Sequence, residues 1–287
     1  MPQLIYVMGN GYNGKSSFVN YMLGHEFVVE DDIDLVGVKN ESLPHAKIRT
    51  DKEQPPQIFE SGPYAFCDCP GSTSKDIEVP EAALKLTQEY ELTNSVKGFI
   101  VVISINELEL RGTDFNKLCH DLQLMTNIDD LSQNIIFLFN NRGDPRQQRT
   151  RYFITINERI NSLKTNSMPR IEENIAELNA SLQQAQQEEL SAKASSNSEA
   201  FFNKSAPTKI ERIKGLLVEA HDLKANIEAT IKLLSLINEN NSVHWKNHAT
   251  PECRELMLKK LESMKAVIPE SCIHFSVPKD SSKLTCN

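Results

Sequence analysis

The stretch MGNGYNGKSSF, residues 8–18, decides the fold class of this chain. The apolar run QLIYVM leads into it and predicts a strand, and the residues from Gly14 onward predict a helix. Gly9, Gly14, Lys15 and Ser16 complete the pattern G-x-x-x-x-G-K-[ST] between the two elements. Because the backbone N–H groups of such a strand, turn and helix converge on a phosphate, the stretch predicts a nucleotide phosphate loop. The alternative is a glycine-rich turn that happens to contain a lysine.

Each position of this loop meets a physical demand of phosphate binding. Glycines let the backbone approach the β-phosphate without side chains in the way. Lys15 brings a positive charge to the β- and γ-phosphates, and the Ser16 hydroxyl offers an oxygen to Mg²⁺. The residues expected to contact nucleotide here are Gly9, Asn10, Gly11, Tyr12, Asn13, Gly14, Lys15, Ser16 and Ser17.

A second motif follows the apolar run YAFCD, which predicts a strand over 64–68. Asp68 ends this run, and Gly71 follows it in the sequence Asp-Cys-Pro-Gly. The carboxyl ends of buried strands are where open α/β sheets bind their ligands. We therefore expect Asp68 to hold Mg²⁺ and the Gly71 amide to face the γ-phosphate, with a plain polar turn as the alternative.

A third motif, Asn141-Arg142-Gly143-Asp144, follows the apolar run NIIFLFN at 134–140. The Asp144 carboxylate can accept hydrogen bonds from the N1–H and 2-amino groups of guanine, which adenine does not offer. Arg142 would cover the base, and Asn141 would tie this turn to the phosphate loop. The motif predicts guanine specificity. If it is a chance turn, the protein is an ATPase.

With these three motifs in order, residues 3 to about 145, together with 271–280, resemble the P-loop GTPases of the translation-factor-related (TRAFAC) class. The Asp-Cys-Pro-Gly form and the segment 95–123 look closest to the septin-like and immunity-associated GTPases. The resemblance implies a three-layer α/β/α G domain with a mainly parallel sheet. It also implies GTP or GDP and Mg²⁺ as ligands, and hydrolysis of GTP to GDP and phosphate in which Lys15 and Gly71 take part.

The resemblance further implies a switch serine or threonine that contacts Mg²⁺ together with Ser16 and Asp68 and acts in catalysis. Thr50 fits by its position before the Asp68 strand, and Ser42 is the alternative. Ser72 stands where many of these GTPases place the glutamine that orients the attacking water. We therefore expect slow intrinsic hydrolysis, or help from a facing protomer or an activator.

Glycine is distributed unevenly along the chain, because only Gly215 follows Gly143 among its 11 glycines. Before that point, apolar runs alternate with amphipathic stretches, which predicts a parallel sheet covered on both faces. The expected strands are 4–8, 64–68, 98–104 and 134–140, and the expected helices are 14–24, 79–93 and 113–126.

Beyond Gly143 the apolar residues keep a helical spacing, from Ile171 to Ala185 and again from Leu216 to Ile237. The polar stretch 191–209 between these seams predicts the turn of an antiparallel, coiled-coil-like helical hairpin. A third helix is expected from Pro251 to about Ala266, because proline suits a first helical turn.

The run SCIHFSV at 271–277 returns to strand character, which makes the helices an insertion. The expected organisation is a G-domain core at 1–150, a helical insertion at 151–267 and a returning last strand at 268–287. The base-pocket motif of that strand would be 276–278 or 281–283. The terminal helix usual in these GTPases is then missing, which suggests a fragment of a longer protein.

Composition narrows the class and the partners. A chain of 287 residues with 39% hydrophobic residues can bury a sizeable core. The 31 basic and 39 acidic residues give a formal net charge of -8 without a dense basic block, which argues against nucleic acid as a partner. Neither a leader nor a transmembrane segment is evident, so a cytoplasmic protein is expected, with its six cysteines reduced.

The expected partners are guanine nucleotide, a second protomer across the nucleotide face, and a protein bound through the helical hairpin. A different class of function stays open beside the GTPase. The chain would then be a nucleotide-binding interaction or scaffold module with little turnover, which acts through that hairpin.

Overall fold

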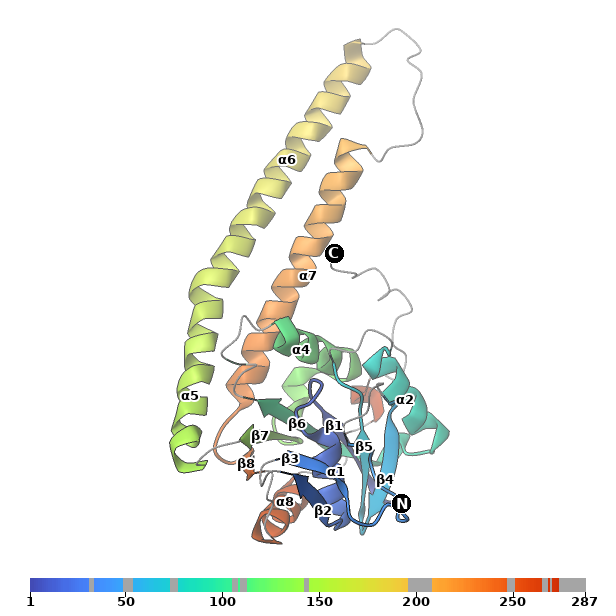
Figure 1. Cartoon of the computed structure of the whole chain (residues 1–287). Helices are drawn as coiled ribbons and strands as arrows, with labels where there is room; N and C mark the ends of the chain where they lie inside the picture. Colours follow the sequence, from blue (N-terminus) through green and yellow to red (C-terminus); the bar gives the residue numbers. More distant parts are fainter. Residues whose placement is uncertain are drawn as a thin grey trace. The chain divides into compact units, whose positions relative to one another are not determined.

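The computed structural model describes residues 1–30, 34–48, 54–72, 77–104, 108, 113–141, 145–195, 208–246, 251–264, 268 and 270–273 (Figure 1). The chain forms two compact units, one of Met1–Arg159 with Lys232–Asn287 and one of Ile160–Ile231. The strands are β1 (Gln3–Met8), β2 (Phe27–Glu30), β3 (Asp34–Val38), β4 (Gln57–Ser61), β5 (Tyr64–Asp68), β6 (Val96–Ser104), β7 (Ile135–Asn141) and β8 (Ser242–Lys246). The α-helices are α1 (Lys15–Leu23), α2 (Val79–Glu89), α4 (Thr113–Met125), α5 (Pro145–Ser162), α6 (Met168–Ser195), α7 (Lys209–Leu236) and α8 (Pro251–Ser263). Short 3-10 turns are Thr93–Ser95, Ile128–Leu131 and Glu270–Cys272.

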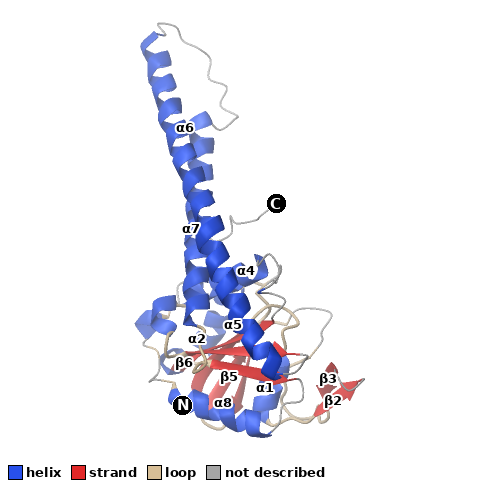
Figure 2. Cartoon of the chain, turned by 90° about the vertical axis from the view of Figure 1, so that its left-hand side faces the viewer, coloured by secondary structure: helices blue, strands red, loops and turns tan. Residues whose placement is uncertain are grey.

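A six-stranded sheet in the order β4-β5-β1-β6-β7-β8 forms the centre of the first unit (Figure 2). Only β4 runs antiparallel to its neighbour, β5, and every other pair is parallel. β2 and β3 form a separate antiparallel pair. The four strands and three helices expected before Gly143 are all present, so the prediction of a mainly parallel sheet is confirmed.

The last strand of the sheet is β8, and the prediction of a returning strand at 271–277 is wrong where the structure describes it. Glu270–Cys272 form a 3-10 turn, and Ile273 makes only a single bridge to Thr126. β8 pairs in parallel with β7 instead. Its sequence SVHWK alternates polar and apolar residues, with Val243 and Trp245 buried, but at five residues it is too short to mark a strand by sequence.

One face of the sheet is covered by α1 and α8. Phe18 and Met22 of α1 join Met257 and Leu261 of α8 in a buried cluster with inward-facing strand residues such as Val102. α8 is therefore part of the first unit and not of the insertion expected at 151–267. It also follows the last strand, where the sequence suggested that a helix was missing.

The opposite face is covered by α2 and α5. Tyr6 stacks on Phe99 within the sheet and its hydroxyl shares a 2.7 Å hydrogen bond with Thr87 of α2. Tyr152 of α5 packs on Phe139 with ring centroids 4.3 Å apart. Because alternate residues of each strand point to opposite faces, the central strands are buried on both sides, as the expected α/β/α layering requires.

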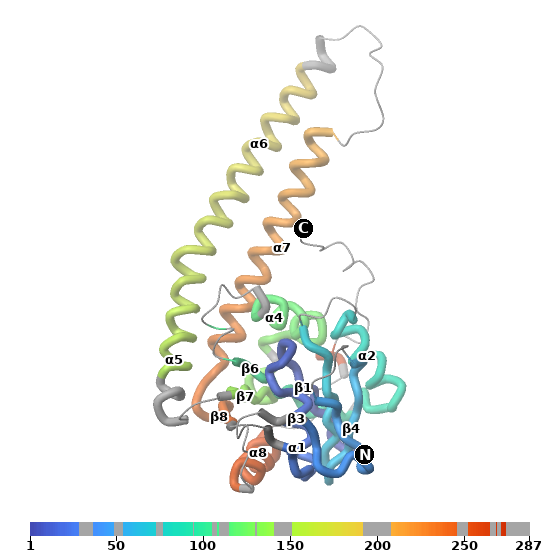
Figure 3. The backbone as a smooth tube through the Cα atoms, in the orientation of Figure 1, coloured from blue at the N-terminus to red at the C-terminus, as the bar shows by residue number. Residues whose placement is uncertain are grey.

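The chain stays helical from Pro145 to Ser195, through a π-helical segment at Leu163–Ser167 (Figure 3). Pro169 explains the π segment. A proline inside a helix has no N–H to donate and its ring crowds the carbonyl of residue i−4, which here is Thr165. Widening the turn by one residue accommodates both effects.

The second unit is an antiparallel helical hairpin, in which α6 and the part of α7 up to Ile231 run side by side (Figures 1 and 2). Its seam consists of Ala185, Ile213 and Leu217, flanked by Ile175, Leu178, Leu182 and Ile210. The α6 half follows the predicted spacing. On α7 the expected seam is confirmed at Ala220, Ile227 and Leu234, which are buried. Leu216 and Leu223 depart from it, because they are 42% and 49% exposed.

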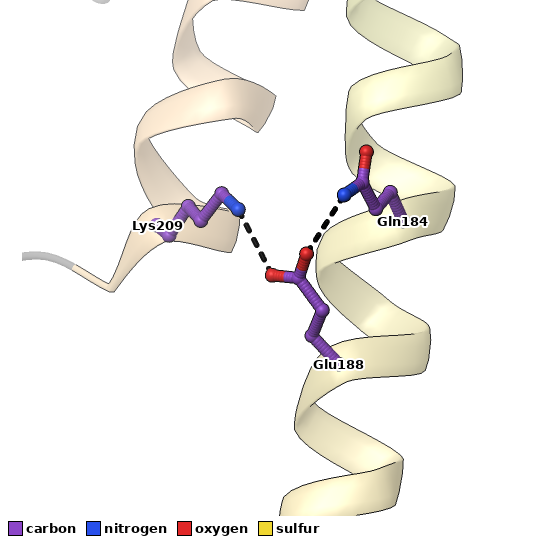
Figure 4. A network of polar contacts seen from close by, with 3 residues as sticks. All are labelled: Gln184, Glu188 and Lys209. Atoms are coloured by element: carbon purple, nitrogen blue, oxygen red, sulfur yellow. Dashed lines mark hydrogen bonds and ion pairs between the residues drawn. The ribbon is translucent and has the colours of Figure 1, made fainter.

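Ion pairs connect the two helices of this hairpin. Lys224 contacts Glu172 at 2.8 Å, and Lys209 contacts Glu188 at 2.9 Å. Gln184 donates to the other carboxylate oxygen of Glu188, so the three side chains form one network (Figure 4). The hairpin occupies 160–231, a shorter insertion than the one expected from the sequence.

Candidate functional site

The glycine-rich turn at residues 9–14 lies between β1 and α1, where the sequence predicts a phosphate loop. We call this turn the cradle. Gly14 caps α1 in a left-handed conformation with φ 91°, and Gly9 has φ 148°. A Cβ on Gly14 would lie 2.8 Å from Asn140 Nδ2, so a side chain has neither the backbone angle nor the space there. Tyr12 also has a positive φ of 61°, and its side chain is 95% exposed. The turn thus presents the N-terminus of α1, which attracts anions.

Lys15, Ser16 and Asp68 converge beside this turn. Lys15 is 7% exposed, and its Nζ donates to the backbone oxygen of Asn10 at 2.8 Å. Ser16 Oγ donates to Asp68 Oδ2 at 2.7 Å. Asp68 reaches this position because β5 pairs in parallel with β1, which places it opposite Val7 at the start of the cradle. The structure therefore brings together the charge and the two oxygen ligands that the sequence predicts.

The electrostatics of Asp68 are set mainly by burial. Burial raises the pKa of its carboxyl to about 6, while the hydrogen bond from Ser16 and the charge of Lys15 lower it. Its Oδ1 atom is buried without a hydrogen-bond partner among the described residues. A buried carboxylate oxygen of this kind is a costly feature unless a ligand satisfies it.

This donor set fits a magnesium ion. Mg²⁺ prefers hard oxygen ligands and is bound in nucleotide sites by one or two protein groups, with water and phosphate supplying the rest. Ser16 Oγ and Asp68 Oδ1 are two such oxygens on adjoining elements. No group of three or more His, Cys, Asp or Glu side chains gathers elsewhere in the described part of the chain.

The loop after Asp68 lies directly on the cradle. Cys69 N–H donates to the oxygen of Val7, and Ser72 N–H donates to the oxygen of Gly9, both at 3.2 Å. A Cβ on Gly71 would lie 2.7 Å from the backbone nitrogen of Gly11, so only glycine allows this approach. Gly71 therefore lies against the turn between β1 and α1, and its contact with the γ-phosphate stays a prediction.

Ser72 does not present its side chain to solvent. It is 0% exposed, and its hydroxyl lies against Asp121 of α4, whose pKa it lowers. Ser72 stands where many of these GTPases place the glutamine that orients the attacking water, and its side chain does not point into the site.

The base side of the site is described in part. Asn140 Nδ2 donates to the backbone oxygen of Asn13 at 2.8 Å, and Asn13 Nδ2 donates to the oxygen of Val102 at 3.1 Å. Asn140 thus makes a connection of the kind that the sequence assigned to Asn141, and the role of the Asn141 side chain stays a prediction. Only the backbone of Asn141 is described, at the end of β7.

Three residues of the base motif, Arg142, Gly143 and Asp144, lie outside the described residues, as does Thr50. Their roles stay predictions. Ser42, the alternative to Thr50, is exposed, and its hydroxyl donates to Asn40 Oδ1 at 2.6 Å.

No protein-family model matches the chain, and no curated protein matches it either. Several solved structures resemble it, among them two of Toc33 from Arabidopsis thaliana. One, in complex with Mg²⁺ and GMPPNP, is 13% identical over 92% of this chain and 84% of that chain, with a TM-score of 0.39. The other, a dimerization-deficient mutant, is 14% identical over 95% of this chain and 87% of that chain, with a TM-score of 0.38. At this level of similarity the functional assignment rests on the chain's own residues, and the septin-like or immunity-associated subtype stays a prediction.

Within the described residues no helix combines the length and the apolar character needed to cross a membrane. The sulfurs of Cys67 and Cys69, beside Asp68, lie 3.9 Å apart, because side chains two residues apart in an extended segment point to the same face.

Three residues that support the site were not found by sequence. Asn140 links β7 to the cradle, and Asp121 faces Ser72. Trp245, 1% exposed on β8, packs edge-on against Phe18 of α1 and lies 3.2 Å from where a Gly14 Cβ would be. Each acts through a contact between elements far apart in the chain, and no local pattern marks such contacts. The one local sign was the tryptophan in the short alternating stretch SVHWK before α8.

Proposed function

We propose that this chain binds GTP and GDP with Mg²⁺ through the cradle of β1 and α1, and that it hydrolyses GTP slowly. The observation that carries the proposal is the 2.7 Å hydrogen bond from Ser16 to Asp68 beside the buried Lys15. Two ligand oxygens and one cation meet at the N-terminus of a helix, which is the arrangement that a Mg²⁺-bound polyphosphate requires.

The proposed phosphate contacts involve donors whose hydrogen bonds are made within the chain in this structure. Lys15 Nζ donates to the oxygen of Asn10 at 2.8 Å, and a phosphate oxygen can accept the same proton with a stronger, charge-assisted bond. The backbone amides leading into α1 supply further donors. Bound Mg²⁺ would neutralise phosphate charge, held by Ser16 and Asp68, with Thr50 as the proposed third contact.

Guanine selection is proposed on the sequence of the turn after β7. Asp144 would accept two hydrogen bonds from the base, and Arg142 would cover its face. Asn140 ties the end of β7 to Asn13 of the cradle, which couples the position of this turn to the phosphate site. ATP binding is the alternative if Asp144 does not contact the base.

Turnover is expected to be low for a structural reason. Ser72 is buried against α4, so it does not reach a water in front of the γ-phosphate. A facing protomer or an activator would then supply the missing group. The same observation favours a second function, a cytoplasmic nucleotide-binding module that acts on a protein partner through its helical hairpin.

Competition binding separates guanine from adenine nucleotides. Purified protein with Mg²⁺ is titrated with fluorescent GDP, and unlabelled GTP, ATP and xanthosine triphosphate compete for the site. We expect GTP to displace the probe and ATP not to, and Lys15→Met and Ser16→Ala to lose binding. Lys85→Met, which removes an exposed lysine of α2, is the matched control. Equal displacement by ATP would refute guanine selection.

The Asp144→Asn variant tests the base contact directly. Asparagine presents a donor where the carboxylate accepted, so preference should move from GTP toward xanthosine triphosphate. A variant that keeps the full preference for GTP shows that Asp144 does not bind the base.

Hydrolysis is measured under single-turnover conditions at low and at high protein concentration. Slow phosphate release that accelerates with protein concentration supports a GTPase completed by a second protomer. No release under either condition rejects the enzyme and leaves the nucleotide-binding module.

A further inference from the structure

A buried polar contact joins the loop after Asp68 to α4, and the proposed function does not account for it. Ser72 is 0% exposed and Asp121 of α4 is 4% exposed. The Ser72 hydroxyl interacts with the Asp121 carboxyl and lowers its pKa, yet the contact falls short of a regular hydrogen bond. Within the described residues, Ser72 Oγ and Asp121 Oδ2 have no other hydrogen-bond partner. Two polar groups that only partly satisfy each other are costly to bury.

The backbone of Ser72 is bound on the other side. Its N–H donates to the oxygen of Gly9 at 3.2 Å, and the preceding residue, Gly71, packs on the backbone of Gly11. Ser72 therefore lies between α4 and the cradle. A shift of Ser72 relative to α4 therefore also shifts Gly71, because a single planar peptide unit joins the two residues.

We propose that Asp121 is a positioning residue that acts through Ser72 to hold Gly71 beside Gly11, at the γ-phosphate end of the nucleotide site. The inference rests on the proposed function, because it assigns Gly71 to the γ-phosphate of GTP. It adds that the preference for GTP over GDP depends on a carboxylate on α4 that touches no nucleotide.

The surroundings of Asp121 favour this role over that of an ordinary core residue. Burial raises the pKa of its carboxyl to about 7, and Glu78 beside α2 raises it further, while Ser72 and Lys117 lower it. The ionised form is thus the one that Ser72 stabilises, because a hydroxyl donates more strongly to a carboxylate than to a neutral acid. A carboxyl with this burial would be replaced by an apolar side chain if packing were its only purpose.

The discriminating measurement is the ratio of affinities for a non-hydrolysable GTP analogue and for GDP, both with Mg²⁺ at pH 8. Both nucleotides share the contacts to Lys15 and the α1 N-terminus, and only the analogue reaches Gly71. We expect Asp121→Asn and Ser72→Ala each to weaken the analogue about fivefold or more while changing GDP less than about twofold. Asp121→Ala should have a larger effect, because the asparagine still offers an acceptor oxygen.

A double-mutant cycle tests whether the two residues act through one contact. If they do, Asp121→Asn combined with Ser72→Ala weakens the analogue no more than the stronger single change. Effects that multiply, or an equal loss for GDP and the analogue, overturn the proposal. Asp222→Asn, the same chemical change at an exposed position of α7, is the matched control and should leave both affinities unchanged.

Thermal unfolding separates positioning from folding. Asp121→Asn removes a buried charge, so its melting temperature at pH 8 should equal or exceed that of the wild type while its GTP preference falls. A lower preference accompanied by a lower melting temperature indicates a structural role and rejects the proposal. If the wild type binds neither nucleotide, the proposed function fails. If the wild type binds both nucleotides and the variants keep its ratio of affinities for the GTP analogue and GDP, only the role proposed for Asp121 is rejected.

Discussion

The two compact units of this chain are stabilised in different ways. The first buries both faces of a six-stranded sheet, with the rings of Phe18, Phe137 and Trp245 almost completely covered. The hairpin at 160–231 buries one narrow stripe, in which Ile213 and Leu217 are each 9% exposed. Its helices also leave four large apolar side chains more than 40% exposed, namely Leu190, Leu216, Val218 and Leu223.

The difference indicates two separate unfolding reactions. Apolar burial contributes in proportion to area, and a two-helix seam removes far less area from water than a three-layer core. A chain composed of units with separate cores does not unfold in one two-state step. The single tryptophan, Trp245, lies in the first unit, so its fluorescence reports that unit, whereas circular dichroism at 222 nm reports helices in both.

The largest effect is expected from Phe137→Ala. Phe137 is 0% exposed in β7, and truncation of a buried phenylalanine costs about 3–5 kcal/mol. Urea unfolding followed by Trp245 fluorescence should show this loss as a lower midpoint. The helical transition of the hairpin should stay that of the wild type, because Phe137 lies in the other unit. Loss of both signals at the same urea concentration would show that the units unfold together.

Asp121→Asn should change the pH dependence of the first unit. The pKa of Asp121 is raised from 3.8 to about 7 in the folded state, so the unfolded chain releases this proton first as pH rises. The stability of the wild type therefore falls between pH 4 and 7, by at most about 4 kcal/mol for this group. The variant lacks that loss and should exceed the wild type at pH 8 but not at pH 4. Parallel stability curves for the two proteins would contradict this.

The phosphate site was predictable because its signals are local. Strand, glycine turn and helix follow each other within 8–18, and Asp68 ends a strand whose apolar run is continuous. Parallel pairing then brings the two together, as the rule about strand ends requires.

The missed features depend on contacts that no local pattern encodes. β8 is five residues long with two buried side chains, and its place in the sheet follows from pairing with β7, about a hundred residues earlier in the chain. The run at 271–277 is the more apolar of the two, so the sequence favours it as the last strand of the sheet. Asp121 on a helix and Ser72 in a loop also give no sign in sequence that they meet. Asn140 is one of two adjacent asparagines, and only the structure shows that it reaches the cradle.

A smaller effect is expected when the hairpin seam is truncated. Leu217→Ala removes a buried side chain from a stripe that lies close to solvent and can relax, so the loss should be near the low end for leucine, about 2 kcal/mol. The 222 nm signal should decline at lower urea, while the fluorescence midpoint stays that of the wild type. Leu216→Ala, at the neighbouring exposed position, is the control and should change neither. A shift in the fluorescence midpoint with Leu217→Ala would show that the two units share one transition.

The smallest effect is expected at the hairpin network of Gln184, Glu188 and Lys209. Glu188→Gln removes the 2.9 Å ion pair with Lys209, but both side chains are at least half exposed. Water screens such pairs, so their contribution to stability is small. The change should therefore be detectable only in the helical transition at low salt and should vanish at high salt, with Glu173→Gln on the exposed side of α6 as the control. A loss as large as that of Leu217→Ala would mean that polar contacts, and not the apolar stripe, hold the hairpin together.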